Sequence, residues 1–124
     1  MLVTTDEERI PHTELSNLVE FFRALADPVR LEMVRCIARD GEVACTTFEG
    51  MFAIAKSTIS YHIRMLRMTG MITVRKDGPF YHYQLVTDTF DQLAPHLLES
   101  LVGRPPEAPI ATARSRSASP AISR

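Results

Sequence analysis

The spacing of apolar residues along the chain predicts several amphipathic helices, the first of which begins near Glu14. Thr13 is a suitable N-cap for it, because a threonine hydroxyl can accept a hydrogen bond from a free backbone N–H of the first turn. The apolar residues of this helix recur at intervals of three and four, which places them on one face. These residues are Leu15, Leu18, Val19, Phe22 and Leu25.

A second helix is predicted over residues 28–39, directly after the dipeptide Asp27-Pro28. Proline disfavours helix in the residue before it but fits the first turn of a new helix, and the aspartate can cap that turn. The dipeptide Asp40-Gly41 predicts the end of the helix. The expected buried face consists of Leu31, Val34, Ile37 and Ala38.

Two further helices are predicted on either side of a tight connection at residues 53–55. The first is short and covers residues 46–52, and the second covers residues 56–69 until Gly70 ends it. Spacings of four and three direct three residues of the longer helix inward. These are Ile59, Ile63 and Leu66.

The region after Gly70 has the composition of β-strands. Residues 71–75 and 80–86 are rich in β-branched and aromatic side chains, and Asp77-Gly78 between them is a strong signal for a hairpin turn. A last helix is expected over residues 88–102, and Pro95 should kink it because proline lacks an N–H and clashes with the preceding turn. The apolar stripe of this helix consists of Phe90, Leu93, Leu97 and Leu101.

The chain of 124 residues has room for one domain. We expect residues 1–12 to be a flexible arm and residues 13–102 to form the domain. Residues 103–124, rich in Pro, Ser and Arg, are expected to be a disordered tail, because they have too few apolar side chains to offset the entropy lost on ordering. The order of the predicted elements is that of a winged helix-turn-helix domain, mainly α with a small β-hairpin.

The outward face of the long helix indicates binding to double-stranded DNA, because a major groove admits one α-helix. Its hydroxyl groups suit contacts to base edges, and its cations suit phosphates. The hairpin is expected to present two more cations at its tip, as a wing. For the helix face alone, an ordinary solvated surface is the alternative. The candidate DNA-binding residues are Lys56, Ser57, Thr58, Ser60, Tyr61, His62, Arg64, Arg67, Arg75 and Lys76.

The formal net charge of −1 hides an uneven distribution. Residues 1–55 carry five basic and ten acidic side chains, whereas residues 56–83 carry five basic side chains and one acidic. A basic helix and hairpin on an acidic body would orient the molecule on a duplex. No apolar run is long enough for a membrane span, and no secretory signal is visible. With only two cysteines as well, we expect a cytoplasmic protein.

Three segments of the chain carry a family resemblance: ALADPVRL at 24–31, KSTISYHIRMLR at 56–67, and GMI at 70–72 with the strand at 81–85. Together they resemble the ArsR/SmtB-type repressors, over about residues 14–102. The resemblance implies a homodimer that pairs through its first and last helices and binds an operator with two-fold symmetry. It also implies repression relieved by a metal or another chemical signal, and it places Ser60 and His62 in the recognition helix.

The predicted dimer has support of its own, because the two end helices carry more apolar surface than so small a domain can cover. A symmetric partner would cover it and would place two recognition helices about 34 Å apart, one turn of DNA. The alternative is that both apolar stripes pack into the core of the monomer. The expected interface residues are Leu15, Leu18, Val19, Phe22, Phe90, Leu93, Leu97 and Leu101.

The sequence does not identify the releasing signal. The Cys-x-Cys pair of many metal-sensing relatives is absent, since Cys45 has no second thiol beside it. His96 and Glu99 match one half of another metal site of the family, with a surface pair as the alternative, while the other half is missing. Cys36 and Cys45 are a possible redox pair, with two inert buried thiols as the alternative. We expect no required cofactor.

The chain is not expected to be an enzyme, because it has no P-loop, Gly-x-Ser-x-Gly, dinucleotide-binding or His-Glu-x-x-His motif. The predicted function is that of a sequence-specific DNA-binding transcriptional regulator, a homodimeric repressor released by an unidentified signal. The alternative is a winged-helix module that binds another protein without specific DNA binding. The lack of acidic residues over 56–71 counts against that alternative.

Overall fold

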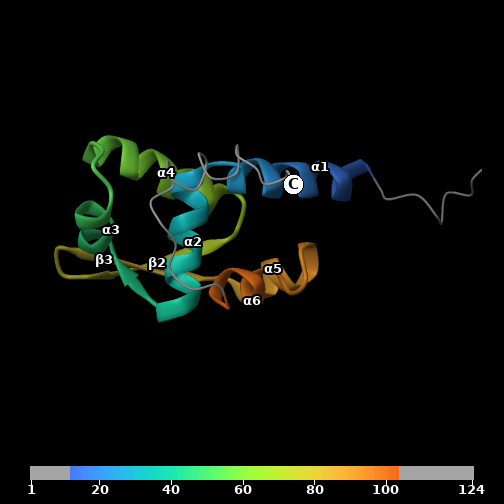
Figure 1. Ribbon diagram of the computed structural model, residues 1–124. Coiled ribbons are helices and arrows are strands. Elements are labelled where there is room, and N and C mark those ends of the chain that lie inside the picture. The colour runs from blue at the N-terminus through green and yellow to red at the C-terminus, as the bar shows by residue number, and fades with distance from the viewer. Residues whose placement is uncertain (1–11, 104–124) are drawn as a thin grey trace, which may run out of the picture.

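The computed structural model describes residues 12–103, which fold into six helices and a small sheet (Figure 1). The predicted N-terminal arm and C-terminal tail therefore lie outside the described residues, apart from His12 and Gly103. The elements in chain order are α1 (His12–Leu25), α2 (Pro28–Asp40), β1 (Val43–Ala44), α3 (Cys45–Met51), α4 (Lys56–Met68), β2 (Ile72–Asp77), β3 (Phe80–Leu85), α5 (Thr87–Leu93) and α6 (Leu97–Val102).

The first four helices lie within one or two residues of their predicted bounds. Asp27 caps α2 as predicted, because its carboxylate accepts hydrogen bonds from the backbone N–H groups of Val29 at 2.9 Å and Arg30 at 3.0 Å. The predicted N-cap of α1 is wrong, since Thr13 lies inside a helix that already includes His12.

The hairpin is confirmed, and it is joined by a strand that the sequence pattern did not predict. Asp77 pairs with Phe80, so the turn consists of Gly78 and Pro79, and Gly78 has a φ of 62°, where glycine is unstrained. The two-residue strand β1 pairs with β3 and makes a three-stranded sheet in the order β1-β3-β2. Two residues are too few to show an alternating pattern.

The core lies where α1, α2 and α4 meet the inner face of the sheet. Phe21 of α1 and Phe90 of α5 are both 1% exposed and pack edge to face, with ring centroids 5.4 Å apart. The buried face of α2 is rotated from the predicted one, because Leu31 and Ala38 are half-buried and a charged side chain takes a core position. The buried residues of α2 are Arg30, Met33, Val34, Cys36 and Ile37.

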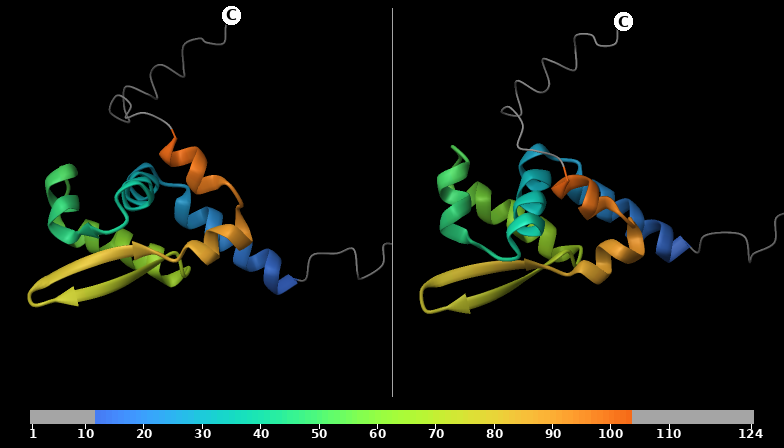
Figure 2. Two further views of the ribbon diagram at one scale, coloured as in Figure 1. Left: turned by 90° about the horizontal axis from the view of Figure 1, so that it is seen from below. Right: turned by 60° about the horizontal axis from the view of Figure 1, so that its bottom comes forward.

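The last predicted helix is broken into two, not merely kinked. α5 ends at Leu93, and Pro95 cannot donate the next helical hydrogen bond. His96 then adopts a left-handed conformation with φ 71°, and α6 folds back against α2 (Figure 2). None of the helices between residues 12 and 103 is long and apolar enough to cross a membrane.

Candidate nucleic-acid interface

The helix α4 is anchored on the body by the three residues predicted to face inward. Ile59, Ile63 and Leu66 are all buried. The short helix α3 is held in turn by Phe48, which is fully buried and stacks on Tyr83 of β3 at 6.0 Å between ring centroids. The two helices of the helix-turn-helix are thus fixed to the core and to the sheet.

The outward face of α4 is polar and basic. The helix contains no acidic residue, and within residues 12–103 none of its three cations forms a hydrogen bond or a salt bridge with the protein. Such cations remain available to phosphate groups. Seven of the predicted DNA-binding residues are exposed on this helix: Lys56, Ser57, Thr58, Ser60, Tyr61, Arg64 and Arg67.

A groove of about 630 Å³ runs between α4, α3 and the hairpin. Lys56, Arg64 and Arg67 line it from α4, and Phe80 and Tyr81 line it from the hairpin. The ammonium of Lys76 lies over the Tyr81 ring, 5.9 Å from its centroid, beside the groove. The hairpin projects from the body beyond α3 in both views of Figure 2. Helix and hairpin therefore form one basic concave surface.

The guanidinium of Arg75 is engaged within the protein, contrary to its predicted role as a free cation at the wing tip. It donates two hydrogen bonds to the carboxylate of Glu42, at 2.9 and 3.0 Å. The same contact lowers the pKa of Glu42 below its ordinary value. This pair joins β2 to Glu42, the residue that precedes β1, and it neutralises the charge of Arg75. The turn of the hairpin lies beyond Arg75, at Gly78.

His62 is buried, although the sequence pattern placed it on the DNA-facing surface. The residue is 8% exposed, and its Nδ1 lies 3.0 Å from Nη1 of Arg30. Arginine has only donors, so Nδ1 of His62 accepts this hydrogen bond and carries no proton. The imidazole therefore connects α4 to α2 and does not face a base pair.

Arg30 is the functional residue that the sequence reasoning missed. Its Nε donates to the carbonyl oxygen of Ala24 at 2.5 Å and its Nη2 to that of Arg23 at 3.4 Å, so it closes the C-terminal end of α1. Together with the bond to His62 it joins α1, α2 and α4. A signal was available, because Arg30 shares a helix face with Met33, Val34 and Ile37 at intervals of three and four.

The pKa of His62 is lowered from its ordinary value of 6.5, chiefly by burial and also by the charge of Arg30. Asp27, whose Oδ2 lies 3.9 Å from Nδ1, opposes that shift. Protonation would turn Nδ1 from an acceptor into a donor that faces the donor of Arg30. The folded protein therefore prefers neutral His62.

Acidification should weaken the fold through His62. Because the unfolded chain takes up this proton at a higher pH than the folded chain, the free energy of unfolding falls as the pH drops through 6.5 to the lowered pKa, and levels off below it. We expect His62→Asn, whose amide oxygen can still accept from Arg30, to lose less stability than the wild type between pH 7.5 and pH 5. Urea unfolding at a series of pH values measures the difference.

All other titrating groups are shared by the wild type and His62→Asn, so their contribution to the pH dependence cancels in the difference between the two stability curves. Parallel stability curves for the wild type and His62→Asn over this range would show that protonation of His62 has no effect on folding.

The predicted dimer residues divide between the surface and the core of the chain. On α1, Leu15 is 45%, Val19 44% and Phe22 49% exposed, while Leu18 is half-buried. On the last two helices, Phe90 belongs to the core of its own chain, so it is not available to a partner. The other three residues of that stripe are half-buried: Leu93, Leu97 and Leu101.

Of the candidate signal-sensing residues, His96 and Glu99 pair with each other, and the two cysteines each contact a glutamate. Nδ1 of His96 lies 3.1 Å from Oε1 of Glu99, and within residues 12–103 no group of three or more potential ligands could hold a metal ion. The thiol of Cys36 contacts Glu32 and that of Cys45 contacts Glu49. Burial is the main cause that raises the pKa of both thiols, which makes them less reactive.

Comparison with known proteins gives the same picture of the helix-turn-helix. The family model described as a helix-turn-helix domain matches residues 25–75. The chain is 36% identical over 83 residues to YceK, an uncharacterised HTH-type transcriptional regulator of Bacillus subtilis. The aligned region covers 66% of this chain and 83% of YceK. It is 32% identical over 91 residues to the transcriptional repressor SmtB homolog of Synechocystis, and this aligned region covers 70% of this chain and 68% of that protein.

Among solved structures, HlyU from Vibrio cholerae superposes with a TM-score of 0.61 at 23% sequence identity. The match covers 76% of this chain and all of HlyU. At this level of identity the likeness concerns the fold, and it confirms the predicted winged helix-turn-helix.

Proposed function

The chain belongs to the ArsR/SmtB family of DNA-binding transcriptional regulators, and from this premise we propose that it is a homodimeric repressor that binds a two-fold symmetric operator. Proteins of this family regulate transcription and are not enzymes. The observation that carries the proposal is the unpaired basic face of α4 beside a projecting hairpin. We further propose that a signal releases the protein from its operator, and that the protein acts in the cytoplasm.

In the proposed complex, α4 enters the major groove and the hairpin follows the adjacent backbone. Ser57, Thr58 and Tyr61 are assigned to base edges, and Ser60 to the margin of the same surface. Four cations neutralise phosphates: Lys56, Arg64, Arg67 and Lys76. Arg75 and His62 are assigned to supporting roles instead, Arg75 through its exposed pair with Glu42 and His62 through its buried bond to Arg30.

The exposed apolar stripe of α1 supports the proposed homodimer. Leu15, Val19 and Phe22 recur at intervals of four and three on one face, and each is nearly half exposed in the single chain. The N-terminal end of α1 also projects from the body, away from the hairpin (Figure 1). A second copy would cover the stripe and leave both α4 helices free, about one turn of DNA apart.

Electrophoretic retardation of the DNA upstream of the coding sequence tests the proposed repressor. We expect the wild type to bind this fragment much more tightly than a random fragment of equal length at the same salt concentration. Equal affinity for the two fragments would rule out specific regulation. Copurification of a protein partner, without affinity for either DNA, would favour an interaction module instead.

The cations of α4 should set the salt dependence of operator binding. Each of Arg64→Ala and Arg67→Ala should reduce the slope of log affinity against log salt by about 1, because one fewer phosphate loses its counterions. Both should weaken binding to operator and random DNA by similar factors. Fluorescence anisotropy of labelled DNA over a range of salt concentrations measures both effects.

Arg39→Ala is the matched control, because it removes an exposed arginine that pairs with Asp40 at the far end of α2. Its slope should equal that of the wild type. Arg75→Ala should change the slope less than Arg64→Ala, since Glu42 already neutralises Arg75. Equal slopes for Arg64→Ala and Arg39→Ala would refute the assignment of Arg64 to a phosphate.

A further inference from the structure

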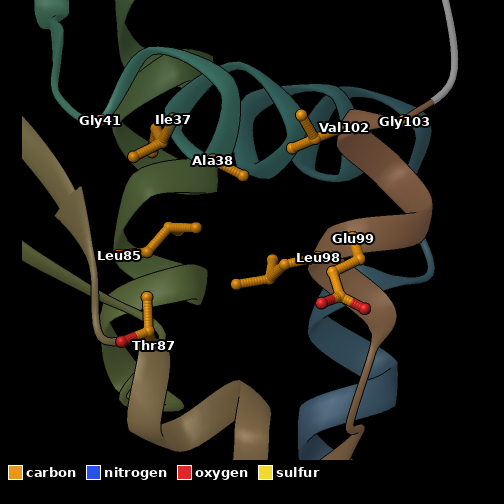
Figure 3. A pocket seen from close by; sticks show the side chains of 9 residues that line it. All are labelled: Ile37, Ala38, Gly41, Leu85, Thr87, Leu98, Glu99, Val102 and Gly103. Atoms are coloured by element: carbon orange, nitrogen blue, oxygen red, sulfur yellow. The ribbon is translucent and has the colours of Figure 1, made fainter.

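A pocket of about 510 Å³ opens between α2, the end of β3 and α6. Figure 3 shows its two walls, with Ile37, Ala38 and Leu85 on one side and Leu98 and Val102 of α6 on the other. The pocket exists because α6 folds back over α2 after the break at Pro95. Its volume is in the range of sites for small organic molecules.

The walls of this α2–α6 pocket are aliphatic, with one ionisable side chain at the margin. Of the nine residues that line it, only Glu99 carries a charge, and its carboxylate is held by His96 at 3.1 Å. Residues 84–103 contain three acidic side chains and no lysine or arginine. On α2, the other wall, Arg35 and Arg39 are paired with Glu32 and Asp40. The charge around the pocket therefore favours a cation at the margin, and the aliphatic walls favour hydrocarbon inside.

The pocket is placed where its contents could affect DNA binding. Leu85 ends β3, the strand at the centre of the wing sheet. Ile37 and Ala38 belong to α2, which holds α4 through Arg30. A molecule that separates α6 from α2 would therefore act on the two elements that position the recognition helix and the wing.

We propose that the α2–α6 pocket binds a small hydrophobic amine in its cationic form. The hydrocarbon part lies between Ala38 and Leu98, and the ammonium group meets Glu99. This ligand is the signal that alters operator binding, a step that rests on the proposed function. The binding of the amine itself does not depend on that function.

Calorimetric titration of the wild type, without DNA, tests the site with three probes of equal chain length. These are n-octylammonium, 1-octanol and n-octanoate, each below its micellar concentration. We expect n-octylammonium to bind most tightly, octanol more weakly and octanoate least. Absence of binding by all three, or tightest binding by octanoate, would overturn the proposal.

Two kinds of variant locate the bound amine. Ala38→Trp and Val102→Trp fill the pocket from opposite walls, and each should weaken binding of n-octylammonium at least about tenfold. Glu99→Gln should weaken the amine about threefold and leave octanol unchanged, as expected for one exposed ion pair. Asp91→Asn is the matched control, because it removes a carboxylate of the same segment that does not line this pocket.

Equal loss in Asp91→Asn and Glu99→Gln would show that the amine responds to general charge and would overturn the assigned contact. Unchanged amine affinity in a folded Ala38→Trp or Val102→Trp protein, verified by circular dichroism, would overturn the site. If these two variants change the oligomeric state in analytical ultracentrifugation and no probe binds the wild type, the pocket belongs to a second copy of the chain.

Retardation of the promoter fragment with and without n-octylammonium tests the coupling separately. We expect the amine to weaken DNA binding of the wild type and not that of Ala38→Trp. Calorimetric binding with no change in DNA affinity would overturn the role as a signal. If the protein fails to select its promoter at all, the proposed function fails, and the calorimetric result still decides the site.

Discussion

Replacement of Arg30 by methionine is expected to lower the free energy of unfolding by about 3 kcal/mol. Methionine has a similar length but cannot donate to the carbonyl oxygens of Ala24 and Arg23 or to Nδ1 of His62. The carbonyl oxygen of Ala24 and Nδ1 of His62 would then stay buried without this donor, whereas the carbonyl oxygen of Arg23 still accepts from the backbone N–H of Ala26. Each buried acceptor left without its donor costs about 1–3 kcal/mol. Urea unfolding at pH 7.5, followed by circular dichroism, measures the change.

Arg35→Met is the matched control, with the same substitution in the same helix. Arg35 pairs with Glu32 at 2.8 Å within the same helix, and both side chains are half-buried, so its loss should cost about 1 kcal/mol. If Arg30→Met and Arg35→Met cost the same, then the contacts of Arg30 contribute no more than a half-buried ion pair within one helix.

The bond between Arg30 and His62 can be isolated by a double-mutant cycle. His62→Leu removes the acceptor, and the combination with Arg30→Met should be less destabilising than the two single changes added together, by about 1 kcal/mol. Strict additivity would mean that the two side chains are close without stabilising each other.

Local patterns in the sequence predicted α1 to α4 and the hairpin to within about two residues, but they did not predict β1 or the division of the last helix into α5 and α6. The capping of α2 by Asp27 and the inward position of Ile59, Ile63 and Leu66 follow from spacing along a few turns of chain. The hairpin follows from strand-forming residues around a glycine turn. Each of these features is decided by neighbours in the sequence, which is why the sequence alone was sufficient.

The errors concern contacts between distant segments. His62 lies 32 residues from Arg30 and Arg75 lies 33 residues from Glu42, so no local pattern shows that these side chains have partners within the protein. Phe90 is likewise withdrawn into the core by Phe21. Pro95 predicted a kink after α5 but not a complete break. The left-handed conformation of His96 depends on how α6 packs against α2.

These corrections remove His62 and Arg75 from the proposed DNA-binding surface and assign them to contacts that position it. The cations left for phosphates are those of α4 and Lys76, while two residues first assigned to DNA hold that surface in place. A change at Arg30 can thus affect DNA binding without any contact to DNA. The position of α4 therefore depends on the same buried hydrogen bonds that stabilise the fold.

Val19→Glu is expected to convert the proposed dimer into a monomer and to weaken operator binding about 100-fold. Val19 lies at the centre of the exposed stripe of α1, between Leu15 and Phe22, and a symmetric interface there would bury two unpaired carboxylates. The loss of DNA affinity follows because a monomer engages one half-site and forfeits the gain from the second, typically about 100-fold or more. Analytical ultracentrifugation measures the oligomeric state, and anisotropy of labelled operator DNA measures the affinity.

Ser16→Glu is the matched control, because it adds the same charge to an exposed position of α1 away from the stripe. It should leave both the oligomeric state and the affinity close to those of the wild type. The Val19→Glu chain should remain folded, since Val19 lies outside the core, and an unchanged circular dichroism spectrum verifies this. A Val19→Glu protein that sediments like the wild type would place the dimer interface elsewhere. A monomeric Val19→Glu protein with full operator affinity would instead show that one subunit suffices for recognition, and the two-fold operator would then lose its physical basis.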